Sequence, residues 1–436
     1  MTSSTPGGDA GMSTRSDAGA TTQTQPTGVA GHAADAGQAA GNADAGAAGK
    51  SASAAAGGGG TGGAMTGTAG AAGASTASSG PPPGSSHPGM GPAETKPISY
   101  GQDATGGGNG AAMKVDSLSA LQAAIDGYSG TGGLVLEYTG MFDFKTISDP
   151  CTQHTKDAQK LEIKNKHDIT LRGADGSSAN FGIHISSGSS NVIVRNMTIG
   201  LTPGGGDSDM ISLEGMSGGM PKSIWIDHNE LFSSLADCPG AGDTAFDGMI
   251  DIKKGADNVT VSYNYMHDHH KMSLNGFNDD DDAVRHVTFH HNLFENIGSR
   301  TPLQRHGYSH LFNNELTKIL TSGINVRMQG YALVEANYFE QVLNPVTSRD
   351  SPMVGYWELR DNNLASAADV AAGNAFGITW DKGSSGTVNA TDWTTTMMFP
   401  APLGYDYHAD SWDCVRDGLR AVAGAGKALA TLSCEK

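Results

Sequence analysis

Long hydrophobic runs are missing from this chain of 436 residues. No stretch approaches the roughly 20 consecutive apolar residues that a membrane-spanning helix needs. Basic residues are scarce too, with 27 Lys and Arg against 45 Asp and Glu and a net charge of −18, which excludes a basic nucleic-acid-binding protein. The four cysteines are too few for a disulfide-framework miniprotein, and the 62 glycines lack the strict period of a collagen. The sequence therefore predicts a soluble, acidic protein with no membrane span and no nucleic-acid partner.

The amino-terminal part has almost nothing to bury. Residues 1–90 contain no Leu, Ile, Phe, Tyr, Trp or Cys, and the composition changes near residue 95. Such a segment cannot offset the conformational entropy that it would lose on folding. We therefore predict a disordered Gly/Ala/Ser/Thr-rich spacer over residues 1–95 and a folded part over residues 96–436.

The cysteines and the amino terminus bear on the cellular compartment. No basic and apolar signal-peptide pattern follows Met1, which fits a cytoplasmic protein, a processed chain or a start codon placed too late. The cysteines Cys151, Cys238, Cys414 and Cys434 favour an oxidising, extracytoplasmic setting. Four cysteines allow three pairings, and spacing alone does not choose between them.

Internal repetition is the main structural signal. A short run of alternating apolar residues that ends in asparagine recurs at spacings of 22 to 35 residues, without long helical patterns between the repeats. Coils of this length bury their inward side chains only against neighbouring coils, which predicts a solenoid rather than an ordinary sandwich. An asparagine at the same corner of each coil can hydrogen-bond along the axis and tolerates left-handed backbone. The repeated asparagines are Asn196, Asn229, Asn264, Asn292, Asn314, Asn337 and Asn362.

The open ends of a solenoid need covers. Ser117 ahead of Leu118, Leu121 and Ile125 has the N-cap and spacing of a short amphipathic helix that caps the first coil. At the other end, the apolar residues between Trp412 and Val422 predict a segment that covers the last coil. The sequence thus predicts an all-β parallel β-helix with an amino-terminal capping helix.

Two groups of charged residues are candidates for chemistry. Asp207, Asp209, Asp247 and Asp251 offer only hard oxygen ligands, which favours calcium over zinc or copper if adjacent coils bring them together. Solvated turn aspartates are the alternative. The more acidic run 279–282 is interpreted as a solvated loop.

The second group is basic. Arg300 and Arg305 flank a proline one coil after Lys271 and can present positive charge to an anionic ligand, although surface arginines often only pair with nearby acids. The histidines lack the spacing of a specific zinc site, so we interpret them as rings packed in register on coil faces. They are His267, His269, His270, His290 and His291.

Three ordered segments, residues 224–232, 247–265 and 287–314, carry a resemblance to a known family, and Gly323 to Arg327 extends it. At these residues the sequence resembles the pectate lyases of polysaccharide lyase family 1, of the pectate lyase C type. The resemblance implies a right-handed parallel β-helix over residues 96–436, extracellular action, a Ca2+ cofactor and cleavage of polygalacturonate by β-elimination.

The resemblance also implies roles for single residues. Arg300 matches the catalytic base, Lys271 and Arg305 match substrate-carboxylate binders, and Arg327 and Lys253 match weaker contributors to substrate binding. Asp209, Asp247 and Asp251 match calcium ligands, with Asp207 in support. The implied disulfides are Cys151 to Cys238 and Cys414 to Cys434. The family leans to a monomer, and the spacer, which the family pattern lacks, is a candidate surface tether.

Three alternative functions fit parts of the pattern. A lyase acting on methylated pectin shares the fold but does not need calcium, and the carboxylates of Asp209, Asp247 and Asp251 argue against it. A polygalacturonate hydrolase needs paired carboxylates placed as acid and base around one bond, whereas the acids here match a metal cluster. A non-catalytic carbohydrate-binding or adhesive solenoid, tethered by the spacer, requires Arg300 to be dispensable.

Overall fold

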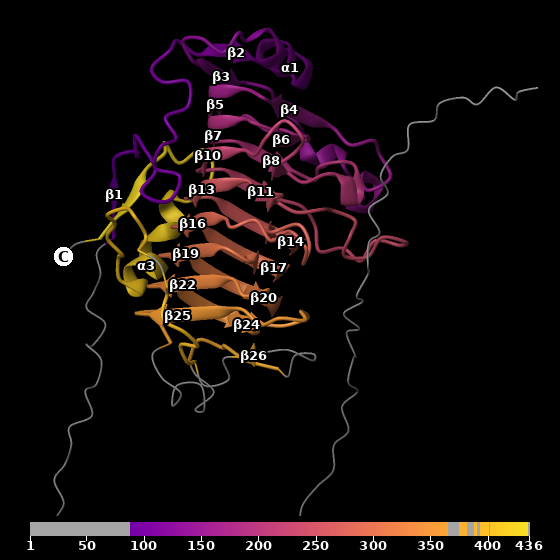
Figure 1. Ribbon diagram of the computed structural model, residues 1–436. Coiled ribbons are helices and arrows are strands. Elements are labelled where there is room, and N and C mark those ends of the chain that lie inside the picture. The colour runs from indigo at the N-terminus through magenta and orange to yellow at the C-terminus, as the bar shows by residue number, and fades with distance from the viewer. Residues whose placement is uncertain (1–87, 365–374, 382–387, 390–392, 401, 435–436) are drawn as a thin grey trace, which may run out of the picture. The chain divides into compact units, whose positions relative to one another are not determined.

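The computed structural model describes residues 88–364, 375–381, 388–389, 393–400 and 402–434. Three parallel sheets stack their strands coil upon coil, so the described chain forms a parallel β-solenoid (Figure 1). This confirms the fold predicted from the repeat. Residues 1–87 of the predicted spacer lie outside the described residues.

The first sheet has ten strands in sequence order. Its strands are β2 (Met113–Val115), β3 (Leu134–Tyr138), β5 (His167–Gly173), β7 (Ser190–Arg195), β10 (Lys222–Asp227), β13 (Asp257–Ser262), β16 (His286–His290), β19 (Tyr308–Phe312), β22 (Tyr331–Glu335) and β25 (Tyr356–Arg360).

The second sheet has six strands, and the third has nine. The second comprises β8 (Thr198–Gly200), β11 (Glu230–Phe232), β14 (Tyr265–Lys271), β17 (Leu293–Ser299), β20 (Glu315–Ser322) and β23 (Tyr338–Val342). The third comprises β4 (Lys160–Lys164), β6 (Gly182–Ser186), β9 (Ile211–Glu214), β12 (Ile250–Lys253), β15 (Ser273–Asn275), β18 (Leu303–Arg305), β21 (Ile324–Arg327), β24 (Val346–Ser348) and the antiparallel β26 (Val388–Asn389).

Apolar side chains stack in register inside the coils. Val192, Ile224 and Val259 lie opposite one another on β7, β10 and β13, and all three belong to the main hydrophobic core. Successive side chains on a strand point to opposite faces, so the residues between them point out of the solenoid. The outer faces therefore carry the polar side chains that form the candidate site.

An asparagine ladder runs along one corner of the coils. The side-chain oxygen of Asn292 accepts from the main-chain and side-chain N–H groups of Asn264, and its own amide donates to Asn314. The same bonds link six of the seven predicted asparagines. Asn196 is the exception. The Asn229 side-chain oxygen accepts from the main-chain N–H of Met197 instead, so Asn196 lies one residue out of register. The left-handed residue of the corner comes one position earlier, as at His228 (φ 52°), so the expectation that the ladder asparagines hold that backbone was wrong.

Helix α1 (Leu118–Gly127) closes the amino-terminal end of the solenoid as predicted. The Ser117 side chain accepts from the Ala120 N–H, and the buried Leu121 and Ile125 join the main core. No helix in the described part of the chain is long and apolar enough to cross a membrane.

Helix α3 (Trp412–Val422) does not cover the last coil, which corrects the sequence prediction. Its Val415 and Leu419 pack with Tyr263, Leu293 and other residues into a second apolar cluster on the flank of the solenoid (Figure 1). Residues of the segment before it, such as Ile378 and Trp393, pack against the end of the main core instead. Amphipathic spacing indicates that a segment has an apolar face, but it does not say which surface that face covers.

An ordered strand lies inside the predicted spacer. Strand β1 (Gly89–Gly91) pairs antiparallel with β27 (Thr431–Ser433), and Thr431 donates a side-chain hydrogen bond to the carbonyl of Pro92. Paired backbone therefore begins at Gly89, inside the predicted spacer of residues 1–95. Composition missed this strand because backbone pairing does not require large apolar side chains.

Candidate active site

The acidic candidates lie together on the outside of the third sheet. Asp251 is on β12 between Ile250 and Ile252, which point into the core, and Asp247 lies just ahead of the same strand. Asp209 precedes the neighbouring β9. Asp207 ends the short 3-10 helix η3 (Gly205–Asp207), and its side chain lies outside the described residues.

Close packing of the backbone brings these carboxylates together. The N–H of Gly248 donates to the Asp209 side chain at 3.1 Å, and a Cβ at Gly248 would lie 2.2 Å from an Asp251 oxygen. Only glycine fits there. The disulfide between Cys151 and Cys238, present as the resemblance implies, ties the 3-10 helix η2 (Pro150–Gln153) to the connection that leads to Asp247.

The three carboxylates repel one another in a largely buried site. Burial raises the pKa of Asp247 to about 7, and the Asp209 charge adds to the rise. Burial, followed by the charge of Asp209, raises the pKa of Asp251 well above its ordinary value. Since burial and like charge both disfavour ionisation, the cluster is stabilised by any cation that enters it.

Lys253 is one such cation. Its ammonium nitrogen lies 3.7 Å from Asp251 and 2.5 Å from Asp209. Burial alone would lower the pKa of Lys253, but these carboxylates outweigh it and raise that pKa. As placed, no three His, Cys, Asp or Glu side chains of the described residues enclose a metal ion. The donor set still fits calcium, because it consists of carboxylate oxygens held under mutual repulsion.

The basic candidates lie on the following coils. Lys271 ends β14 opposite Ser299 of β17, and Arg300 follows directly with a left-handed backbone (φ 65°). Arg305 on β18 lies opposite Arg327 on β21, so both point out from the third sheet. The structure thus brings together the basic residues named from the sequence.

Three of these cations have acidic partners that the sequence analysis did not place in the site. Lys271 lies 3.7 Å from Asp243, and Arg305 lies 2.8 Å from Asp279. Arg327 lies 3.8 Å from Asp350. The sequence analysis interpreted Asp279 as part of a solvated loop and did not single out Asp243 or Asp350, because the course of each loop depends on the stacked coils.

Arg300 differs from its neighbours. Within the described residues, its guanidinium has no hydrogen bond or ion pair. Burial lowers the pKa of Arg300, the Asp251 charge opposes this, and Arg305 lowers it further. The same causes, burial and then the charge of Arg305, lower the pKa of Arg327 to about 10. Burial also lowers the pKa of Lys271, against the charge of Asp243. Arg300 is therefore a partly desolvated guanidinium near both the acidic cluster and the other cations.

The candidate histidines take part in ring stacks. His267 stacks on Phe232, His290 on Phe312 and His291 on Tyr263. His269 is fully buried and meets Ser233, while His270 lies at the end of the same strand. The stacked rings confirm the predicted packing along coil faces for His267, His290 and His291.

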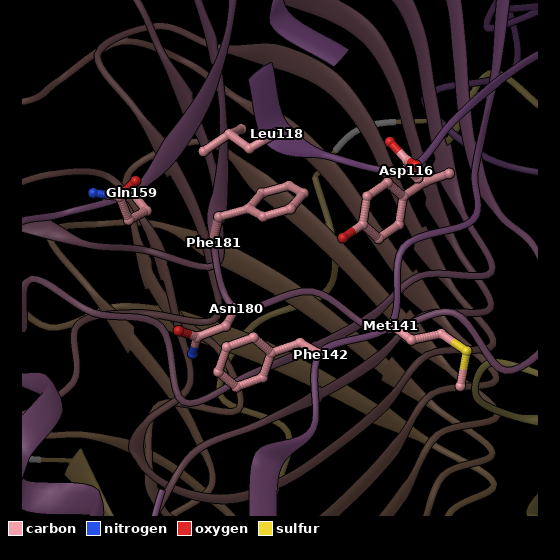
Figure 2. A pocket seen from close by; sticks show the side chains of 8 residues that line it. Asp116, Leu118, Met141, Phe142, Gln159, Asn180 and Phe181 are labelled. Carbon is pink, nitrogen blue, oxygen red and sulfur yellow. The ribbon is translucent and has the colours of Figure 1, made fainter. Parts of the chain in front are cut away.

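A separate cavity of about 350 Å3 lies at the amino-terminal end of the solenoid. Figure 2 shows Phe142 and Phe181 turned into it, with Asp116 and Asn180 at its sides. None of the described residues that line it is basic, and none belongs to the acidic or basic candidates. This cavity is therefore not suited to bind a polyanion.

Comparisons with known proteins agree on one family. The family model described as pectate lyase matches residues 18–428. Pectate lyase B of Dickeya chrysanthemi is 44% identical over 330 residues, which cover 73% of this chain and 85% of the relative.

Solved structures give the same result. Pectate lyase II of Xanthomonas campestris is 52% identical with a TM-score of 0.72, covering 77% of this chain and 100% of that one. Pectate lyase C of Erwinia chrysanthemi, solved at pH 9.5 with 30 mM Ca2+, is 40% identical with a TM-score of 0.71, covering 78% and 99%. An arginine-to-lysine variant of pectate lyase C, in complex with pentagalacturonic acid, has the same identity and coverage and a TM-score of 0.72.

Proposed function

The chain belongs to the pectate lyase family and is a polysaccharide lyase, and on that premise we propose that it cleaves α-1,4-linked polygalacturonate by calcium-dependent β-elimination with Arg300 as the base. The observation that carries the proposal is the half-buried guanidinium of Arg300, which has no hydrogen bond or ion pair within the described residues and lies near the acidic cluster, Lys271, Arg305 and Arg327. The complex of a similar protein with pentagalacturonic acid supports the substrate class.

The acidic cluster is the proposed metal site. Asp209, Asp247 and Asp251, with Asp207, would hold the calcium ion, which when bound supplies Lewis-acid stabilisation to the carboxylate of a galacturonate unit. The structure of pectate lyase C from Erwinia chrysanthemi with 30 mM Ca2+ supports the choice of this ion. Lys253 would remain the second source of positive charge in the cluster.

The basic residues would bind the other substrate carboxylates. Lys271 ends β14 of the second sheet, Arg305 and Arg327 lie opposite each other on the third sheet, and all three carry charge opposite to that of a polyuronate. Local positive charge matters here because the whole chain has a net charge of −18, which repels a polyanion. Salt limits this repulsion to about 10 Å at moderate ionic strength.

Arg300 would then remove the C5 proton, which is acidic because it lies α to a carboxyl group. The C5–H electron pair forms the C4–C5 double bond, the C4–O bond breaks, and the leaving oxygen gains a proton from solvent. Burial and nearby cations disfavour the guanidinium form and so make Arg300 a stronger candidate base than an exposed arginine. The product is a 4,5-unsaturated oligogalacturonide.

Two further parts of the proposal concern location and assembly. Two disulfides, Cys151–Cys238 and Cys414–Cys434, support action outside the cytoplasm. We propose a monomer, with residues 1–87 as a spacer that serves as a surface tether.

Ultraviolet absorbance of the unsaturated product separates the candidate functions. Polygalacturonate should give rising absorbance that a chelator abolishes and added calcium restores. A lyase for methylated pectin would give chelator-insensitive absorbance, and a hydrolase would give reducing ends without absorbance. An adhesive solenoid would give neither, and that result would overturn the proposal.

A further inference from the structure

The loop between β15 and β16 is only in part the solvated acidic loop that its sequence suggested, because Asp280 and Asp282 are exposed whereas Asp279 and Asp281 are held by other residues. Asp281 is largely buried, with a side-chain exposure of 7%. One of its carboxylate oxygens accepts the main-chain N–H groups of Lys254 and Phe277, each at 2.8 Å, and the other accepts from Arg285 at 2.9 Å. Asp281 therefore anchors the loop to the coil below.

Arg285 joins this loop to the strand that carries Arg305. Its side chain has no exposed surface, and its Nη2 donates to the carbonyl groups of Asp281 at 2.8 Å and Arg305 at 3.2 Å. A Cβ at Gly276 (φ 111°) would lie 2.6 Å from that nitrogen, so only glycine lets the loop pass this close. Removing either member of a buried ion pair leaves an uncompensated charge, so this pair fixes the loop firmly.

The anchored loop presents two acceptors to Arg305. The Arg305 Nε donates to Asp279 at 2.8 Å, and the Arg305 Nη1 donates to the carbonyl of Gly276 at 3.0 Å. The guanidinium is planar and rigid, so two fixed acceptors on different sides set its orientation. Within the described residues, its Nη2 has no hydrogen bond, and this nitrogen is left to meet an anion.

We propose that Asp279 is a positioning residue, which holds the Arg305 guanidinium in the orientation that binds a substrate carboxylate. The inference rests on the proposed function, in which Arg305 binds polygalacturonate. Ordering a long side chain on binding costs free energy, and Asp279 removes that cost by ordering Arg305 beforehand. The opposite reading, in which Asp279 competes with substrate for Arg305, predicts that removing the carboxylate strengthens binding.

Three single variants distinguish these readings. Asp279→Ala should raise KM for polygalacturonate about tenfold, with kcat little changed, because it releases a ground-state contact. Asp279→Asn keeps an acceptor oxygen for Nε and should restore KM to within about twofold of the original protein. Asp280→Ala removes an exposed carboxylate from the same acidic run and is the matched control. A lower KM for Asp279→Ala would overturn the inference. So would a rise in KM for Asp279→Asn and Asp280→Ala that equals the rise for Asp279→Ala.

A double-mutant cycle tests whether Asp279 acts through Arg305. In an Arg305→Ala background, Asp279→Ala should have no further effect on KM, because no guanidinium remains to be held. Binding of pentagalacturonate measured by calorimetry gives the same comparison without turnover, and thermal melting confirms that each variant is folded. A tenfold loss that persists in the double variant would contradict the positioning role.

The same experiments separate this inference from the proposed function. If Arg305→Ala raises KM and Asp279→Ala does not, only the positioning role fails. If Arg305→Ala leaves both KM and pentagalacturonate affinity unchanged, the substrate-binding role of Arg305 fails and this inference fails with it. If the original protein yields no unsaturated product yet loses pentagalacturonate affinity on Asp279→Ala, the lyase proposal fails and the positioning role stands.

Discussion

The ammonium nitrogen of Lys253 lies 2.5 Å from the Asp209 carboxylate, across two neighbouring coils of the solenoid. The resemblance gave this lysine a minor part in substrate binding, whereas its contacts are to the acidic cluster. Lys253 is the internal counter-charge of that cluster, and a bound cation would share the same carboxylates. The contact would link the proposed calcium requirement to the charge of Lys253, because both cations draw on the same carboxylates.

Asp251→Asn should raise the calcium concentration needed for half-maximal activity by about tenfold or more, because it removes an anionic ligand of a hard cation. The fold should persist, since asparagine can still accept the Leu274 N–H. A calcium titration of product absorbance measures the effect, and Asp280→Asn, an exposed acid outside the cluster, is the control. Full activity of the original protein in excess chelator would contradict the proposed calcium site.

Arg300→Lys should lower kcat by about 100-fold or more with little change in KM, because a misplaced base loses rate more than affinity. Arg305→Lys should show the reverse pattern, a higher KM with a smaller loss of kcat. Steady-state kinetics on polygalacturonate with saturating calcium give both constants. Were Arg300→Lys to change KM alone, Arg300 would be a binder and the base would lie elsewhere.

Truncation should reveal the strand that composition missed. A chain that starts at Ser86 keeps β1 and should keep the melting temperature and turnover of the full protein. A chain that starts at Lys96 loses the pairing with β27 and uncovers Leu432, so its melting temperature should fall by about 3 to 6 °C. Calorimetric melting of the two truncated chains makes the comparison, and equal melting temperatures would show that β1 adds no stability.

His184 should stabilise the protein in a pH-dependent way. Burial opposes protonation, but Glu162 at 2.8 Å and Glu214 at 3.3 Å outweigh it and raise the pKa of His184 to about 9. This stabilisation is fully present below the ordinary pKa of 6.5 and is lost as the pH rises through about 9.

His184→Gln should therefore lower the melting temperature clearly at pH 6 and hardly at pH 10. His167→Gln, at a histidine whose side chain is half exposed, is the matched control. A loss of equal size at both pH values would mean that packing, and not charge, explains the effect of His184.

Asn292→Ala should destabilise the fold by about 2 to 4 kcal/mol, because it leaves the buried N–H groups of Asn264 without an acceptor. Denaturant unfolding compares it with Asn109→Ala, at an exposed asparagine outside the ladder. Equal free energies of unfolding for the two variants would show that the ladder does not contribute to stability.

The sequence by itself determined the solenoid, because each coil repeats the apolar alternation and the corner asparagine that stacking requires. It also indicated the carboxylates of Asp209, Asp247 and Asp251 and the cations around Arg300, since their residue types limit the chemistry they can perform. The sequence did not determine the register of every coil. Asn196 matches the repeated pattern but lies one residue out of the asparagine ladder. A one-residue offset is invisible in a pattern whose coil lengths vary.

Only the tertiary structure decided which charges meet. The run 279–282 has the composition of a solvated loop, yet Asp281 is anchored by Arg285 and Asp279 holds Arg305. The pairing of β1 with β27 and the packing of α3 on Tyr263 and Leu293 likewise join segments more than 100 residues apart. A local sequence pattern indicates which secondary structure a segment can form. The stacking of the coils decides which residues contact one another, because it places distant residues side by side and removes them from water.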